Sequence, residues 1–417
     1  MERLPGFRDF YPEPLPNSEA WSADAHQYIF DTWRAAARRF GFREYDGPPL
    51  EPLELYTKKS GEEIVGQLYN FEDKGGRHIA LRPEMTPTLA RLVAAAERNY
   101  KKPIKWFALP QLFRYERQQK GRLREHFQFN ADIFGESDPA ADAELICLCI
   151  DALRAFGLTP DDFVIRLSSR NAWQDFFRER GGTGATEYEF YQVIDKLERD
   201  SPDQTRAKLS PLNISHDDVT GFITAARPTA ELQSIVDNLS ARGLGDFIKV
   251  DYNVIRGLAY YTGVVFEAFD RKGEFRAIAG GGRYNNLVKL ISDGKVDMPA
   301  IGFGMGDVVL LELLKARGLL PAFDSKVDLY CLIEGEDLRN DSLRLIRDLR
   351  DQRWSVEYSL TPMKVDKQFK RAQELGAGRT IKIEKSPDGQ ATARIRDLKT
   401  REEKTSELGA LIALLKS

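Results

Sequence analysis

The sequence has few of the residues from which disulfide frameworks and metal centres are built. Its 417 residues include four histidines and only three cysteines, which are Cys147, Cys149 and Cys331. Three cysteines make no disulfide framework, and a single Cys-x-Cys spacing is not a zinc-binding pattern. The histidines form no H-E-x-x-H motif or cluster. These scarcities predict a protein of a reducing compartment that has no structural metal.

Long apolar runs and a strong charge imbalance are absent as well. No apolar run approaches the ~18 residues that crossing a membrane requires, so we expect no membrane association. The proline-rich residues 1–17 contain no apolar signal core, and we therefore expect a cytoplasmic protein. The net charge of −3 gives no general attraction to nucleic acid, so polyanion binding has to come from local basic patches.

Several common catalytic motifs are also missing. No Walker loop, kinase loop or G-x-G-x-x-G motif leads from a predicted strand into a helix, and no Ser-His-Asp or Cys-His arrangement is suggested. What remains is a composition of 42% hydrophobic and 30% charged residues, which is typical of a soluble globular protein. The length favours two or three domains.

Hydrophobic periodicity predicts an antiparallel sheet with flanking helices in the first two-thirds of the chain. Residues 171–245 differ, because they are helical, charged and punctuated by glycine and proline, and they predict an inserted helical subdomain. Helices are predicted elsewhere in this part from Ser18, which caps the first of them, to Phe40, after a cap at Thr86, and over 139–156. Strands are predicted over 44–53 and within 161–169 and 246–269. A strand, a glycine-rich turn and a helix follow over 274–290, and a strand and a helix over 299–316.

The C-terminal part changes to a regular alternation of strands and helices after a predicted linker at 318–325. This alternation predicts an α/β domain of about 90 residues with a mostly parallel sheet. Its predicted elements are strands at 327–333, 354–360, 379–384 and 391–398, and helices at 337–353, 364–376 and from 406. No glycine fingerprint follows the first strand, so dinucleotide binding is not expected.

The stretch from Trp106 to Gly135 combines aromatic strands with a dense cationic loop. Arg114 and Glu116 are two residues apart, so on a strand they share a face. On the return strand Gln128, Asn130 and Asp132 share a face in the same way. Guanidinium forks beside amide and carboxylate acceptors suit a nucleotide phosphate together with a small polar, cationic substrate. A solvated charged hairpin is the alternative interpretation.

A second group of polar residues lies within apolar segments further along the chain. Arg256, Tyr260 and Tyr261 need partners if they are buried, and together they can surround a small polar ligand. The glycines Gly280–Gly282 could approach phosphates, although such glycines more often serve steric needs. Arginines, acceptors and glycines fit the attack of a carboxylate on the α-phosphate of ATP, where guanidinium groups and Mg²⁺ stabilise the developing charge.

Taken together, the motifs resemble those of the class II histidyl-tRNA synthetases, in the same order and over essentially the whole chain. The matching segments are LPGFRDFYP (4–12), LRPEMTPTLAR (81–91), FRYERQQKGRLREHFQFNADIFG (113–135), RGLAYYTGVVFE (256–267), GGGRYNNL (280–287), PAIGFGMG (299–306) and KQFKRAQELGA (367–377). The resemblance implies an α+β fold with a class II antiparallel sheet and a helical insertion. It implies a catalytic domain at 1–320 and a smaller α/β, anticodon-binding-like domain at 326–417.

The resemblance also implies roles for individual residues in forming histidyl-adenylate from L-histidine and ATP. Arg114 and Arg256 are the implied catalytic arginines on the α-phosphate and the substrate carboxylate. The implied ATP-binding residues are Arg114, Glu116, Arg122 and Phe127. The implied histidine-binding residues are Glu84, Thr86, Arg114, Gln128, Asp132, Arg256, Tyr260 and Tyr261. The glycines Gly280–Gly282, Gly302 and Gly304 would let backbone approach substrate.

Partners follow from the same resemblance. The expected substrates are ATP with Mg²⁺, L-histidine and histidine tRNA, whose terminal ribose receives the histidyl group. A homodimer is implied, with the helix over 18–40 and the strand over 44–53 at its interface.

Four positions depart from the family pattern. Ala259 stands where many members have Asp, and His126-Phe127 replaces Phe-His. Val308 stands at the place of an arginine in the pattern G-L-E-R, which normally meets adenine and the γ-phosphate. A non-catalytic relative, a regulatory subunit of ATP phosphoribosyltransferase, is one alternative. A class II synthetase for proline or threonine is another.

Overall fold

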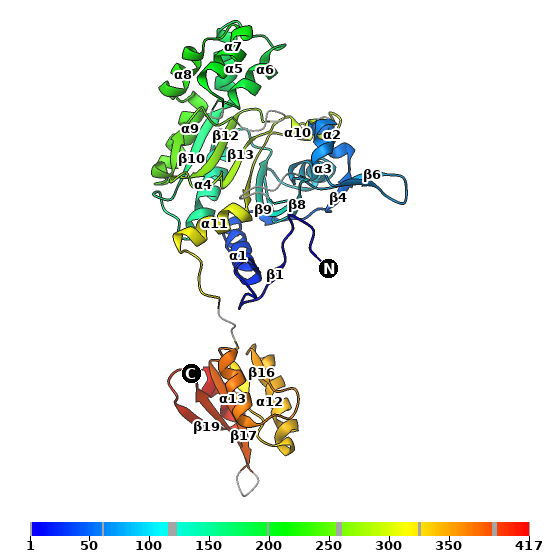
Figure 1. The fold of residues 1–417 in the computed structure, drawn as a ribbon, viewed down its shortest axis with the longest axis vertical. Helices are drawn as coiled ribbons and strands as arrows, with labels where there is room; N and C mark the ends of the chain where they lie inside the picture. Colours follow the sequence, from blue (N-terminus) through cyan, green and yellow to red (C-terminus); the bar gives the residue numbers. More distant parts are fainter. Residues whose placement is uncertain are drawn as a thin grey trace. The chain divides into compact units, whose positions relative to one another are not determined.

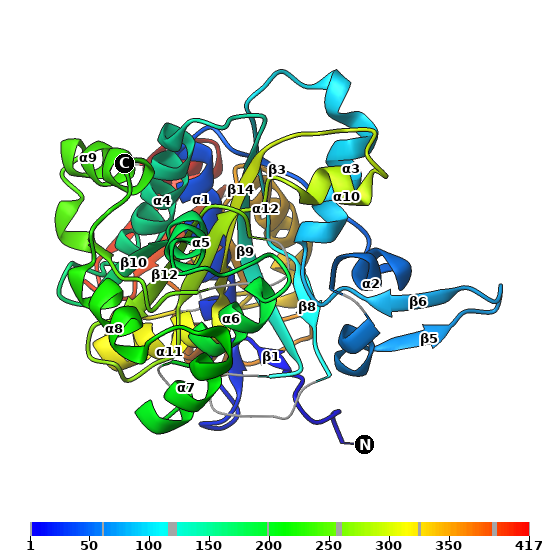
Figure 2. The ribbon, with the colours of Figure 1, turned by 90° about the horizontal axis from the view of Figure 1, so that it is seen from above.

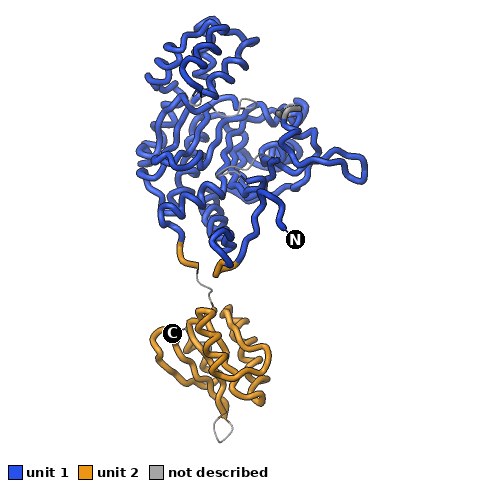
Figure 3. The backbone as a smooth tube through the Cα atoms, viewed as in Figure 1, with its two compact units in different colours: residues 1–11, 16–320 blue, residues 12–15, 321–417 orange. Residues whose placement is uncertain are grey.

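The computed structural model in Figure 1 describes residues 2–60, 62–115, 123–197, 200–255, 261–323, 327–385 and 390–416. The chain divides into two compact units (Figure 3), of which the first holds residues 1–11 and 16–320 and the second holds residues 12–15 and 321–417. Among the described residues, no helix combines the length and apolar character needed to cross a membrane.

The first unit is built on a nine-stranded sheet with the order β11-β10-β12-β13-β14-β9-β7-β3, and β8 pairs with β9 beside this path. The strands are β3 (Arg43–Glu44), β7 (Ile104–Ala108), β8 (Gln111–Phe113), β9 (Glu125–Phe134), β10 (Phe163–Ser169), β11 (Ile248–Val250), β12 (Val264–Asp270), β13 (Ala279–Arg283) and β14 (Ala300–Gly306). The pairs β10–β11 and β3–β7 are parallel, and the other pairs are antiparallel. The predicted fold class is confirmed.

Helices α1 (Ala23–Arg39), α4 (Pro139–Arg154) and α11 (Asp307–Arg317) pack along this sheet (Figure 1). Helix α1 buries Ile29 and Trp33, and the Trp33 ring stacks on Phe129 with its centroid 5.7 Å away. The predicted start of α1 at Ser18 is wrong. Trp21–Ser22 (β2) pairs with Phe10–Tyr11 (β1), so the helix begins later, and the Ser22 hydroxyl accepts a hydrogen bond from the Ala25 amide at 3.1 Å.

The strand predicted over 44–53 is two strands in different sheets. β3 joins the main sheet, whereas β4 (Leu50–Pro52) belongs to a three-stranded sheet in the order β4-β6-β5. Pro48 and Pro49 lie between them and lack the amide donors that a continuous ladder needs. β5 (Asn70–Glu72) and β6 (His78–Leu81) extend as a hairpin in Figure 2.

Short helices accompany this smaller sheet. They are α2 (Glu54–Ser60), the 3₁₀ segment Glu62–Gln67, α3 (Thr86–Ala96), the 3₁₀ segment Glu97–Asn99 and α10 (Leu287–Ile291). Thr86 is the first residue of α3 rather than its cap, because Met85 stands at the capping position and no side-chain cap is formed there.

The segment between β10 and β11 is helical, as the sequence indicates, and its outer helices group together at one end of the unit in Figure 1. Its helices are α5 (Arg170–Glu179), α6 (Glu187–Ile194), α7 (Pro202–Leu209), α8 (His216–Ala225) and α9 (Ala230–Ala241), with 3₁₀ turns at Ser210–Leu212 and Gly245–Phe247. Trp173 is the centre of an aromatic core, with the ring centroids of Phe222 and Phe176 at 4.7 and 5.5 Å.

The second unit has a five-stranded sheet in the order β16-β15-β17-β18-β19. Its elements are β15 (Leu329–Cys331), a 3₁₀ turn at Glu336–Leu338, α12 (Arg339–Asp351), β16 (Val356–Tyr358), α13 (Val365–Glu374), β17 (Arg379–Lys385), β18 (Ala391–Asp397), β19 (Glu403–Glu407), a 3₁₀ turn at Leu408–Ala410 and α14 (Leu411–Lys416).

Two predictions for this second unit are wrong. The sheet is mixed rather than mostly parallel, because β15 pairs in parallel with β16 and β17 while β17, β18 and β19 pair antiparallel. The final helix begins at Leu411 rather than 406, because β19 occupies Glu403–Glu407. This edge strand was missed because its sequence, EKTSE, is polar and exposed and carries no apolar alternation.

Candidate active site

A polar cavity lies in the first unit on one face of the main sheet. It is lined by residues from strands β9, β13 and β14, from the segment that opens α3, from the residues that follow β8 and β13, and from the segment before β12. They are Glu84, Thr86, Arg114, His126, Gln128, Asn130, Asp132, Tyr261, Gly280, Tyr284, Gly302, Phe303 and Gly304. Six of the predicted site residues are therefore brought together: Glu84, Thr86, Arg114, Gln128, Asp132 and Tyr261.

Strand β9 supplies one wall of the cavity through alternate residues. His126, Gln128, Asn130 and Asp132 line it, as the period of two in a strand requires. The shared face predicted for the last three is confirmed.

Phe127 is the predicted site residue that β9 turns away from the cavity. Its ring packs instead against His26 and Phe30, with centroid distances of 4.5 and 5.4 Å. His126, not Phe127, is therefore the ring that this strand presents to the cavity.

The glycines of β13 and β14 are explained by close packing within the sheet. A Cβ atom on Gly302 would lie 1.8 Å from Asp132 Oδ1, and one on Gly304 would lie 2.6 Å from Gln128 Cδ. A Cβ on Gly281 would meet the Gly302 carbonyl oxygen at 2.1 Å. The predicted glycine-rich turn at Gly280–Gly282 is wrong, because these residues form β13 itself. The glycines leave room for the side chains of Asp132 and Gln128.

Asp132 is a buried carboxyl at one end of the cavity. The Tyr284 hydroxyl donates a hydrogen bond to Asp132 Oδ1 at 2.5 Å. Burial raises the pKa of Asp132 to about 7, and the hydrogen bond from Tyr284 acts in the opposite direction. Such a carboxyl can accept an N–H or share a proton near neutral pH. Tyr284 was missed from the sequence, although it follows the glycine strand directly.

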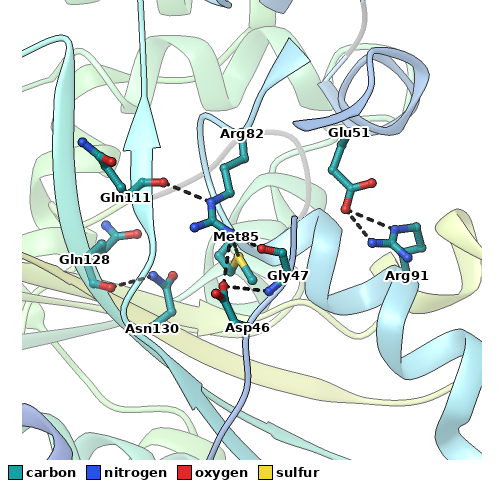
Figure 4. Close-up of polar contacts among 9 residues, drawn as sticks. All are labelled: Asp46, Gly47, Glu51, Arg82, Met85, Arg91, Gln111, Gln128 and Asn130. Atoms are coloured by element: carbon teal, nitrogen blue, oxygen red, sulfur yellow. Dashed lines mark hydrogen bonds and ion pairs between the residues drawn. The ribbon is translucent and has the colours of Figure 1, made fainter. Parts of the chain in front are cut away.

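Two arginines hold the start of the segment Arg82–Thr86. The buried Arg82 donates from Nε to the Gln111 carbonyl at 3.0 Å and from Nη1 to the Gly47 carbonyl at 2.6 Å (Figure 4). Arg114 donates from Nε to the Pro83 carbonyl at 3.2 Å. These bonds set the backbone that carries Glu84 and Thr86 into the cavity.

An ion pair fixes the helix that follows this segment. Arg91 of α3 contacts Glu51 of β4 with an Nη2–Oε1 distance of 2.6 Å (Figure 4). The Glu51 side chain is buried, so the pair anchors α3 to the smaller sheet.

Four predicted site residues, Glu116, Arg122, Arg256 and Tyr260, lie outside the described residues, as does Ala259. The position assigned to the missing arginine needs a correction. Counted from Gly306, the pattern G-L-E-R places the arginine at Val309 rather than at Val308. Both valines are apolar, and Val308 is buried in α11.

No metal centre made from side chains is present in the part of the chain that the structure describes. Within it, no three His, Cys, Asp or Glu side chains are grouped so that they could hold an ion. A protein-bound Mg²⁺ commonly keeps several waters and uses one or two carboxylates together with substrate phosphates.

Comparison with known proteins gives a consistent result. The family model described as "Histidyl-tRNA synthetase" matches residues 15–307. A histidine–tRNA ligase of Opitutus terrae is 46% identical over 428 aligned positions, which cover 97% of this chain and 95% of that protein. A chloroplastic/mitochondrial histidine–tRNA ligase of Arabidopsis thaliana is 37% identical over 409 positions, covering 94% of this chain and 82% of that protein.

A solved structure shares the same fold. The crystal structure of histidyl-tRNA synthetase from Nostoc sp. PCC 7120 superimposes with a TM-score of 0.76 at 21% identity, and the match covers 97% of each chain.

Proposed function

Because this chain belongs to the histidyl-tRNA synthetase family, we infer that it is a histidine–tRNA ligase. It activates L-histidine with ATP to histidyl-adenylate and transfers the histidyl group to the 3′ end of histidine tRNA. The observation that carries this inference is the 46% identity to a histidine–tRNA ligase across 97% of the chain.

We propose that the end of the cavity at Asp132 binds the imidazole ring. A free imidazole has a pKa of about 6.5 and offers one N–H donor when neutral and two when protonated. The buried Asp132 carboxyl accepts such a donor, and Gln128 and Tyr261 line the same cavity. Glu84 and Thr86 would bind the α-amino group from the opening of α3.

We propose that the other end of the cavity binds ATP, with Arg114 on the α-phosphate. A guanidinium group forms paired hydrogen bonds with phosphate oxygens and stays charged at all working pH values. His126 would be the ring that stacks on adenine; the support for this is that His126 lines the cavity and Phe127 does not. Glu116 and Arg122 remain predicted ATP-binding residues. Mg²⁺ would arrive with ATP and be held mainly by its phosphate oxygens.

The chemistry proceeds in two displacements. A carboxylate oxygen of histidine attacks the α-phosphorus, an O–P bond forms, and pyrophosphate leaves. A hydroxyl of the terminal tRNA ribose then attacks the activated carbonyl carbon and AMP leaves. Arg114 and the predicted Arg256 would neutralise charge that grows on the α-phosphate in the first step. The enzyme therefore works by positioning and charge neutralisation, without a covalent enzyme intermediate.

We propose further that the two units divide the work. The first unit, which holds the cavity, is the catalytic domain, and its helical segment between β10 and β11 contacts tRNA. The second unit is an anticodon-binding-like domain. The enzyme acts as a homodimer in the cytoplasm, and the three buried free cysteines suit a reducing compartment.

The dimer proposal draws support from apolar side chains of the smaller sheet. Leu50 is 40% exposed and Phe71 is 51% exposed. Light scattering coupled to size-exclusion chromatography measures the mass directly. A mass near one chain at micromolar concentration would contradict the dimer.

The deciding experiment for the enzyme is ATP–pyrophosphate exchange, run with the purified full chain and each of the twenty amino acids. We expect exchange that depends on histidine, and aminoacylation of histidine tRNA in the same preparation. Arg114→Ala should reduce exchange by at least about a hundredfold, since it removes a charge from the transition state. A folded protein that shows no exchange with histidine would falsify the ligase assignment and leave the non-catalytic relative as the alternative.

A further inference from the structure

Arg8, in the segment before α1, forms a buried ion bridge between two carboxylates. Its Nε donates to Glu125 Oε1 at 2.6 Å, and its Nη1 donates to Asp307 Oδ2 at 2.7 Å. The three side chains are 1%, 1% and 3% exposed. Burying charges costs free energy unless they are closely paired, as these three side chains are. The bridge is therefore a structural element of the fold.

The two carboxylates lie at the ends of two strands, β9 and β14, that line the cavity. Glu125 is the first residue of β9, and Asp307 directly follows β14 as the first residue of α11. Asp307 Oδ1 also accepts the Phe127 amide at 2.9 Å, and Glu125 Oε2 accepts the Gln111 side-chain amide at 3.0 Å. His126 therefore has both of its chain neighbours fixed by the same network.

The N-terminal segment is tied to this place by more than one contact. The Gly6 carbonyl accepts the amides of Arg124 and Glu125 at 3.0 and 3.3 Å. The Arg8 guanidinium carbon lies 4.6 Å from the centroid of the Trp21 ring and 5.1 Å from that of Phe10. The segment thus closes over the back of β9, on the side of Phe127 rather than of the cavity.

The bridge lies at the nucleotide end of the proposed site. His126 and Asp132 are six residues apart on one strand, which corresponds to about 20 Å. The bridge flanks His126, whereas Asp132 binds imidazole in our proposal. The bridge also stands next to Val308 and Val309, where the family pattern would supply an arginine of its own.

We propose that Arg8 is a positioning residue for the nucleotide, which makes the N-terminal segment part of the ATP site. Arg8 does not line the cavity, so it acts through the two strand ends and through His126. The Arg8 guanidinium, which comes from a distant segment, thereby fixes the start of β9 and the end of β14. The family's expected arginine is absent next to that end of β14. This inference rests on the proposed ligase function.

The test is histidine-dependent pyrophosphate exchange with Arg8→Lys in the full chain. Lysine keeps the charge but replaces the planar fork with one flexible ammonium group, which cannot hold both carboxylates in the same geometry. We expect the KM for ATP to rise about tenfold while the KM for histidine stays within about twofold. Arg3→Lys is the matched control, because Arg3 is an exposed arginine of the same segment that pairs with Asp9 at 3.3 Å.

The two possible failures are distinguishable. If the wild-type protein shows no exchange, the ligase function is wrong. If the wild type is active and folded Arg8→Lys changes both KM values equally, or neither, the role of Arg8 is overturned. If Arg8→Lys does not fold, Asp307→Asn decides by the same comparison, since it keeps an acceptor for the Phe127 amide and removes the charge that Arg8 binds.

Discussion

The Tyr284 hydroxyl lies 2.5 Å from a carboxylate oxygen of Asp132, and this contact joins strand β9 to the residue that follows β13. The contact shows how the site is assembled. Strand pairing brings Gly302 opposite Asp132, the missing side chain of Gly302 leaves space, and Tyr284 then reaches the carboxyl. The same contact underlies the first prediction.

Asp132→Asn should change how the stability of the protein depends on pH. Burial raises the pKa of Asp132 from 3.8 to about 7, so between these values the folded state holds a proton that the unfolded state releases. The free energy of unfolding of the wild type therefore falls by about 4 kcal/mol in total as the pH rises through this window. The asparagine variant lacks this loss.

Urea unfolding of both proteins at pH 4 and pH 8 measures the effect. The free energy of unfolding of the variant minus that of the wild type should increase by about 4 kcal/mol between pH 4 and pH 8. An unchanged difference would show that Asp132 titrates normally. The same variant should lose most histidine activation, because a neutral amide replaces the proposed acceptor.

Gly302→Ala should weaken histidine activation without unfolding the protein. The new Cβ would overlap Asp132 Oδ1, so the carboxyl has to leave its place beside Tyr284. We expect the KM for histidine to rise at least about tenfold in the exchange assay. Gly306→Ala is the control on the same strand, because a Cβ there meets nothing within 4 Å. Equal activities of the two variants would contradict this explanation.

Much of this fold and part of the site could be predicted from the sequence, and the limits have physical causes. Alternation along β9 is a local property, so the shared face of Gln128 and Asp132 was predictable. Phe127 was assigned to the site by resemblance, although the same alternation turns it away. Tyr284 and Arg8 were missed because their partners, Asp132 and Asp307, are 152 and 299 residues away along the chain.

Ser22→Ala should destabilise the first unit by about 1 kcal/mol, because it removes the side-chain acceptor for an amide at the start of α1. Ser18→Ala, at the cap expected from the sequence, should leave stability unchanged. Thermal unfolding monitored by circular dichroism compares the two variants. A larger loss from Ser18→Ala would show that the helix begins earlier than Ala23.

Arg82→Lys should weaken histidine binding from outside the cavity. Arg82 bonds two backbone carbonyls, those of Gly47 and Gln111, and lies 3.7 Å from the Met85 sulfur, so it fixes the segment that bears Glu84 and Thr86. Lysine presents one nitrogen and cannot reproduce two divergent bonds. We expect the KM for histidine to rise about tenfold and the KM for ATP to change less, which is the opposite of the pattern expected for Arg8→Lys.

Arg91→Lys provides the matched control for Arg82→Lys. Arg91 lies in the middle of α3, the helix that this segment opens, but it pairs with Glu51, away from the cavity lining, and its side chain is 38% exposed. Both KM values of this variant should stay within about twofold of wild type. If Arg82→Lys and Arg91→Lys behave alike in folded proteins, the backbone bonds of Arg82 do not position the amino-group binding segment. If Arg82→Lys and Arg91→Lys differ as expected, each half of the cavity is held in place by its own arginine. Arg82 positions the residues that bind the amino acid, and Arg8 positions those that bind the nucleotide.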